Sequence, residues 1–223
     1  NKIAIFSTED SAKIEITLTD STTKKTKAFT PFTITLNKGE SYQISAKKNC
    51  FDGSRIKVLN DKKVIAYTGD KGVDGRIYGG CGHRQFTTNL HDVTWSDTKY
   101  ITMPFFGQKN GYFVKLLTLD SAMQVKVNDK TYKIHSMDSA LVIDVPKEDS
   151  VLVISGPRKF ACFQIMKGGG KNGFYKYTGA GHPSMVQVIS PANLTTASSF
   201  ISLDSTLNSD HYISVLIPKK GKY

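Results

Sequence analysis

The chain has 223 residues, a hydrophobic content of 39% and a formal net charge of +11. This length allows one large β domain or two modest ones, and the hydrophobic content excludes a disordered chain. No stretch approaches the roughly 20 apolar residues that a spanning helix needs, so no membrane span is expected. The lysines occur in short scattered pairs without the Arg-rich, aromatic-interleaved pattern of a nucleic-acid surface, so no nucleic-acid partner is expected either.

Alternating apolar and polar residues predict β-strands along much of the chain, and helical periodicity is almost absent. In chain order the predicted strands are Lys13–Leu18, Phe32–Leu36, Ser41–Ser45, Gln124–Val127, Thr131–Ile134 and Ala140–Val145. Turn-forming clusters separate them, such as Asn37–Glu40 and Val127–Lys130. The pattern is typical of an all-β sandwich or barrel.

The sequence also resembles itself at an offset of about 100 residues, the spacing of a tandem repeat. The matching segments are Thr8–Ala12 with Thr118–Ala122, Ser54–Tyr67 with Ser150–Phe163, Gly80–His83 with Gly179–His182, Tyr100–Thr102 with Phe200–Ser202, and Gly111–Leu117 with Asp210–Leu216. Within the second match, residues 60–63 and 156–159 both read as turns. Because all the blocks keep their order, we predict two tandem, structurally related β-sandwich units from an internal duplication. Residues 1–110 would form the first unit, and residues 111–223 the second unit with a closing C-terminal strand.

Three segments that overlap these repeats carry a family resemblance. Lys62–Gly69 (KKVIAYTG), Gly79–Phe105 and Gly181–Met185 (GHPSM) resemble the motif succession of the N-terminal domain of IgGFc-binding proteins. A family cysteine is replaced here near Lys71, and a double proline before the tryptophan is His91-Asp92. The resemblance implies a secreted, β-rich, mucus-associated adhesion module without catalysis, with immunoglobulin as a candidate partner.

The cysteines allow at most one intramolecular bridge. Cys162 aligns with Ala66 in an apolar strand and is therefore expected to be a small core residue. Cys50 and Cys81 both occupy loop positions, so we favour a Cys50–Cys81 disulfide that closes a loop of about 30 residues. Asn193 begins an Asn-Leu-Thr sequon and is a candidate glycosylation site, which favours a secreted, extracellular location.

Two Gly-rich basic loops, expected at residues 68–80 and 166–173, are the predicted contact regions, because binding residues concentrate on loops over a rigid β scaffold. The candidate binding residues on and beside them are Lys71, Arg76, His83, Arg84, Lys167, Lys171 and His182. His83 and His182 lie in equivalent Gly-x-Gly-His turns. No cysteine or histidine spacing suits a metal, so neither a metal nor a cofactor is predicted.

No catalytic residue is predicted, because Ser184 lacks the strained turn of a hydrolase nucleophile and no carboxylate pair stands out. The sequence therefore predicts a secreted, non-catalytic binding module for an extracellular protein or glycan. The net charge motivates an alternative, a module for heparin-like anionic glycans. A glycan or ester hydrolase is the remaining alternative, based only on the versatility of the fold.

Overall fold

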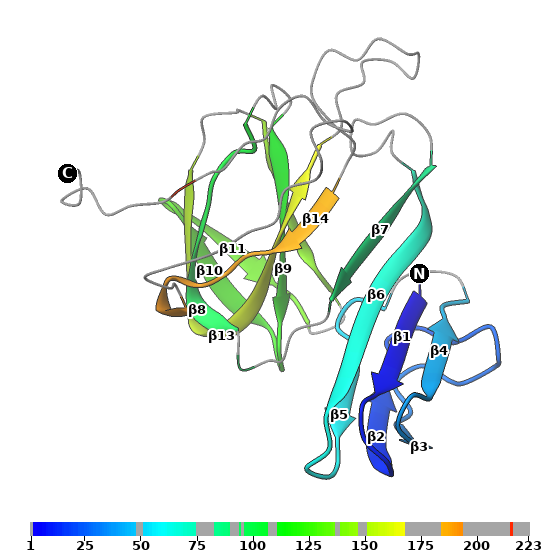
Figure 1. The fold of residues 1–223 in the computed structure, drawn as a ribbon. Coiled ribbons are helices and arrows are strands. Elements are labelled where there is room, and N and C mark those ends of the chain that lie inside the picture. The colour runs from blue at the N-terminus through cyan, green and yellow to red at the C-terminus, as the bar shows by residue number, and fades with distance from the viewer. Residues whose placement is uncertain are drawn as a thin grey trace.

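The computed structural model describes most of the chain up to residue 193 (Figure 1). The described residues are 2–47, 51–74, 83–89, 94, 96–106, 111–136, 139–146, 151–167, 184–193 and 215, without the side chains of residues 70–74, 83–89 and 184. The strands are β1 (Lys2–Ser7), β2 (Ala12–Thr17), β3 (Phe32–Leu36), β4 (Ser41–Ser45), β5 (Arg55–Val58), β6 (Val64–Asp74), β7 (His83–Asn89), β8 (Asp97–Thr102), β9 (Tyr112–Thr118), β10 (Met123–Val127), β11 (Lys130–Ile134), β12 (Leu141–Val145), β13 (Leu152–Met166) and β14 (Ser184–Gln187), followed by the 3-10 helix η2 (Pro191–Asn193).

Strands β1 to β7 form what we call the first sandwich. One sheet has the order β3-β2-β5, and the other has the order β4-β1-β6-β7. Alternation places Ile14 and Ile16 of β2 and Ile5 of β1 in the same core, where each is fully buried. The core therefore lies between the two sheets, as period-two patterning of antiparallel strands requires.

Strands β8 to β14 form the second sandwich, which is drawn in green to orange in Figure 1. The first half of β13 pairs with β8 and β10, and its second half pairs with β9 and β14. A register shift between Ser155 and Phe160 separates the two halves. The prediction of a turn at residues 156–159 is therefore wrong, because the strand continues through them and joins both layers of the sandwich.

The two sandwiches use the same set of strand pairings. β1 pairs with β4 and β6, and β9 pairs with β12 and the second half of β13. β2 pairs with β3 and β5, and β10 pairs with β11 and the first half of β13. This correspondence supports the duplication, which stays a prediction together with the division at residue 110. β8 precedes that division but pairs with β13 of the second sandwich.

The predicted strands are confirmed to within one residue at each end, and β3 and β4 have the predicted bounds. Two of the predicted turns, Asn37–Glu40 and Val127–Lys130, are also confirmed by left-handed backbone conformations. Gly39 has a φ of 81° and Asn128 has a φ of 51°. Glycine and asparagine are the residues that adopt this region most readily, so both hairpins are encoded locally.

Specific contacts connect the sandwiches. The Lys115 ammonium lies 2.6 Å from a carboxylate oxygen of Asp52, and both side chains are only partly exposed. The Arg55 guanidinium donates a hydrogen bond to the Leu119 carbonyl oxygen. Edge strand β7 also approaches β14. The loop before β5 is thereby held against the β9 side of the second sandwich.

Candidate functional site

The predicted Gly-rich loops differ from expectation where the structure describes them. β6 continues to Asp74, so Lys71 lies in a strand rather than in a loop. His83 is the first residue of β7 rather than a turn residue, and Arg84 follows it, opposite Val73. Cross-strand pairing overrides the turn tendency of the glycines in this segment. The binding roles of Lys71, His83 and Arg84 remain predictions.

Five further predicted positions lie outside the described residues. They are Arg76, Lys171 and His182 among the binding candidates, and Cys50 and Cys81 of the predicted disulfide. Asn193 is exposed at the end of η2, and its Nδ2 donates a hydrogen bond to Ser190 Oγ at 3.2 Å. The glycosylation of Asn193 and the disulfide also remain predictions.

Lys167 follows β13 and is nearly buried, with 9% of its surface exposed. Its ammonium contacts the Asp144 carboxylate of β12 and lies 4.5 Å from the centre of the Phe113 ring of β9. An ammonium over an aromatic face and beside a carboxylate is stabilised by both. Lys167 thus links neighbouring strands, and its binding role remains a prediction.

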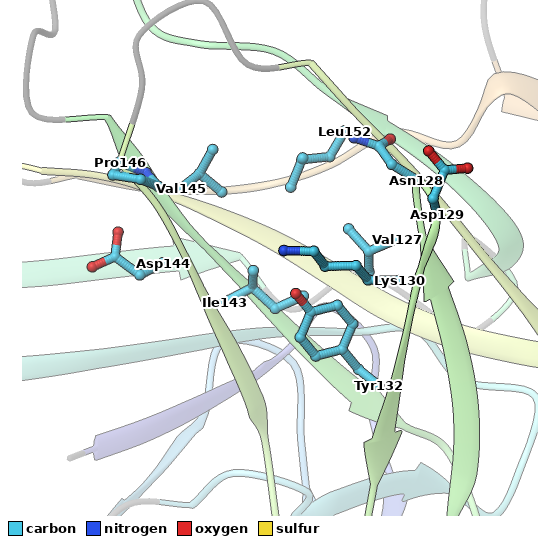
Figure 2. Close-up of a pocket in the computed structure, with 10 residues that line it drawn as sticks. All are labelled: Val127, Asn128, Asp129, Lys130, Tyr132, Ile143, Asp144, Val145, Pro146 and Leu152. Carbon is cyan, nitrogen blue, oxygen red and sulfur yellow. The ribbon is translucent and has the colours of Figure 1, made fainter.

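A pocket opens at one end of the second sandwich, between the β10–β11 hairpin and β12 (Figure 2). Its volume is about 270 Å³, and Val127, Ile143, Val145 and Leu152 form its apolar lining. Asn128, Asp129, Lys130, Tyr132, Asp144 and Pro146 complete it. A cavity of this size fits one side chain or one sugar residue rather than a larger ligand.

Lys130 and Tyr132 supply the polar groups in the middle of the pocket, where Figure 2 shows their side chains together. Lys130 is paired with Val127 and shares the inward-facing side of β11 with Tyr132 and the buried Ile134. Deeper in the sandwich, this side of β11 carries a core residue, Ile134. At the open end the same side carries Lys130, whose ammonium lies in the pocket. Sequence reasoning missed it because the predicted strand began one residue later, at Thr131.

Neighbouring polar groups are engaged elsewhere. Asn128 Oδ1 accepts a hydrogen bond from the Val153 backbone nitrogen at 2.8 Å, which fixes the hairpin to β13. The Asp144 carboxylate pairs with Lys167, and in Figure 2 the Asp129 and Asp144 carboxylates lie at opposite ends of the view. No carboxylate within the described ranges forms an ion pair with Lys130. The pocket can therefore hold a small group with a hydrogen-bond acceptor or an anionic end and an apolar body.

The strongly perturbed titratable groups lie in the core and away from this pocket. Burial raises the pKa of the Cys162 thiol, which is fully buried as the sequence predicted. Burial also raises the pKa of Tyr100 to about 12, and its hydroxyl donates to the Phe160 carbonyl oxygen at 2.6 Å. Both groups stay neutral near pH 7, so their environments suit packing rather than acid, base or nucleophilic chemistry.

The described part of the chain contains no group of three or more His, Cys, Asp or Glu side chains placed to hold a metal ion. Across the same residues, no helix is long and apolar enough to cross a membrane.

Comparison with known proteins decides the family. A family model described as "IgGFc binding protein" matches residues 1–222, which is nearly the whole chain. The chain belongs to this family. The resemblance expected from Lys62–Gly69, Gly79–Phe105 and Gly181–Met185 is thereby confirmed. Searches of curated proteins and of solved structures both give no match.

Proposed function

We propose that the chain is an extracellular, non-catalytic binding module that recognises a protein or glycan partner. The family match carries this proposal, because it covers residues 1–222 and its description names binding rather than a reaction. The pocket adds support, because it offers a cation, a hydroxyl and an apolar lining, and the Asp144 carboxylate in its lining is paired with Lys167. Such a site can recognise a group with an acceptor or anionic end and an apolar body.

The Fc region of immunoglobulin G is the first partner to test, because the family description names it. We propose Lys130 and Tyr132 as contact residues for such a partner. An exposed ammonium beside a tyrosine hydroxyl recognises a carboxylate or a row of hydroxyl oxygens, and the apolar lining accepts the rest of the group. The same chemistry would accept a side chain of a protein or a sugar residue of a glycan.

Binding of the whole chain to immobilised Fc, with Fab fragments as the control surface and a glycan array in parallel, tests the proposal. We expect specific binding that weakens about tenfold in Lys130→Ala, as the loss of a charged contact predicts. Lys27→Ala removes an exposed lysine of the first sandwich and should leave the affinity unchanged. Failure to bind Fc and every arrayed glycan would contradict the proposal, as would steady turnover of ester or glycoside substrates.

The proposed extracellular setting has its own test. Expression through a secretory pathway, followed by alkylation of the denatured chain without reductant and intact-mass measurement, should reveal one alkylated thiol, the buried Cys162, and a pair protected as Cys50–Cys81. Asn193→Gln should remove the mass of one N-linked glycan. Alkylation of all the cysteines without reduction would exclude the disulfide and leave the binding proposal to the Fc and glycan experiments.

A further inference from the structure

The outer surface of the sheet layer β11-β10-β13-β8 carries a group of lysines, which we call the lysine face. It consists of Lys99, Lys126 and Lys133 with the polar residues Gln124, Thr131 and Ser155. In the strand register, Lys126 stands opposite both Thr131 and Ser155, Ser155 stands opposite Lys99, and Gln124 stands opposite Lys133. The lysines therefore lie on adjoining strands and point away from the core.

The geometry of a β-sheet fixes the spacing of these charges. Neighbouring strands lie about 4.8 Å apart, so the backbones that carry Lys126 and Lys99, on either side of Ser155, are separated by about 10 Å. All the lysines of the face are exposed, and none has an ion-pair partner among the described residues. The face is an array of free ammonium groups interspersed with hydroxyl and amide groups, and the exposed Val153 and its partner Ile101 lie on the same side.

Acidic residues lie only at the margins of this array within the described strands. Asp97 is at the start of β8, where its carboxylate accepts a hydrogen bond from the Thr98 backbone nitrogen at 2.7 Å. Asp129 is in the turn between β10 and β11. Neither stands opposite a lysine of the face in the strand register. The positive potential in the middle of the face is therefore not neutralised locally.

The corresponding face of the first sandwich differs in charge. Glu15 lies between the inward-facing Ile14 and Ile16, as Lys126 lies between Val125 and Val127. Glu15 stands opposite Lys57 of β5, so a carboxylate and an ammonium adjoin there. Lys13 and Arg55 share that outward side, so the first sandwich presents a carboxylate among its cations, whereas no carboxylate lies between Lys99, Lys126 and Lys133 in the second.

We propose that the lysine face binds an extended, sulfated polysaccharide of the heparin type. Ammonium groups act as point charges for sulfate, and Gln124, Thr131 and Ser155 offer hydrogen bonds to sugar hydroxyls between them. The face carries no aromatic side chain for the base stacking that single-stranded nucleic acids use. The proposal rests on the proposed function only in that the chain is a binding module, because the lysine face is separate from the pocket.

Heparin-affinity chromatography of the folded whole chain tests this assignment. The variant K99Q/K126Q/K133Q should elute at clearly lower salt and bind a heparin oligosaccharide about tenfold more weakly, because several exposed charge contacts of modest strength are lost together. The matched control K13Q/K38Q/K57Q removes the same charge from exposed lysines of the first sandwich and should change the affinity less than twofold. K99R/K126R/K133R keeps the charge and should restore binding.

Each other outcome overturns the assignment. Equal losses in the two glutamine variants would show that net charge alone governs retention. Binding to a DNA duplex or to phosphatidylserine vesicles that equals heparin binding, and is lost in the same variant, would assign the face to another class of partner. Fc binding measured on the same variants separates the two proposals. We expect K99Q/K126Q/K133Q to keep its Fc affinity, and an absence of Fc binding would leave the heparin result intact.

Discussion

The two sandwiches share their pairing scheme but differ in how the layers are joined. In the first sandwich β5 and β6 are separate strands in separate sheets, whereas in the second the continuous β13 takes both places. The second sandwich also gains β8. The shared part is the buried alternation on paired strands, such as Ile14 and Ile16 on β2 and Val125 and Val127 on β10. Burial restricts these positions to apolar residues, whereas connections and outward positions are free to vary.

The outward positions are where the sandwiches acquire different surfaces. Glu15 beside Lys57 gives the first sandwich a mixed face, and Lys126 beside Ser155 gives the second a positive one. The open end of the second sandwich adds Lys130 to an otherwise apolar pocket. A common scaffold with divergent surfaces is the arrangement expected of binding modules, where sites are placed on a fold rather than created by it.

The largest expected effect of a single substitution lies in the core of the second sandwich. Phe160 is fully buried and packs edge-to-face on Tyr100, with ring centres 5.0 Å apart. Phe160→Ala should lower the free energy of unfolding by about 3 to 5 kcal/mol. Phe32 of the first sandwich is only half-buried, so Phe32→Ala should have a smaller effect. Denaturant unfolding measures both, and equal losses would contradict the burial difference.

Two glycines with positive φ provide the next comparison. A Cβ on Gly111 would lie 1.8 Å from the Val145 carbonyl oxygen, whereas a Cβ on Gly39 would have no neighbour within 4 Å. Gly111→Ala should therefore destabilise the chain by about 3 kcal/mol, from backbone strain and overlap together. Gly39→Ala should cost about 1 kcal/mol from strain alone. Thermal unfolding of the pair tests this order, and a reversed order would contradict the contact at Gly111.

Alkaline pH should destabilise the second sandwich through Tyr100. Burial raises its pKa from the ordinary tyrosine value of about 10 to about 12, so folding favours the neutral phenol. The stability that the neutral Tyr100 phenol contributes is fully present below pH 10. As the pH rises from 10 to 12, the free energy of unfolding falls by about 2 to 3 kcal/mol through this group. Tyr100→Phe should flatten the decline between pH 10 and pH 12 in a series of unfolding measurements. An unchanged slope would assign the alkaline loss to other groups.

The smallest predicted effect concerns the coupling of the two sandwiches. The Lys115–Asp52 pair joins them at 2.6 Å, with side-chain exposures of 21% and 26%. A double-mutant cycle with Lys115→Met and Asp52→Asn should give a coupling free energy of about 1 kcal/mol. A coupling of zero would show that this ion pair does not contribute to holding the sandwiches together.

Much of the strand pattern could be predicted because alternation and turn residues are local signals. β3 and β4 have their predicted bounds, and Gly39 and Asn128 adopt the turn conformations that their side chains favour. Cys162 was correctly placed in the core because its strand is apolar on that side. These features depend on the alternation of apolar and polar residues and on local turn residues rather than on distant contacts.

The path of β13 could not be predicted, because distant contacts determine it. Gly156 and Pro157 are typical of a turn, but the Arg158 guanidinium in the same segment bonds an Asp120 carboxylate oxygen at 2.6 Å and the Ala122 carbonyl oxygen at 2.8 Å. These bonds hold the segment against the start of β10. The extension of β6 through Lys71 likewise depends on pairing with β7. Tertiary pairing therefore corrected the predicted loops, while the binding roles of the residues placed on them remain predictions.

Lysine footprinting with a bound heparin oligosaccharide tests the central claim, that the second sandwich carries the binding surface. Each exposed lysine is acetylated with and without the oligosaccharide, and its modification is read by peptide mass spectrometry. We expect protection at Lys99, Lys126 and Lys133, with Lys13, Lys38 and Lys57 modified equally in both samples. Protection of the first sandwich's lysines, or uniform protection of both sets, would contradict the account.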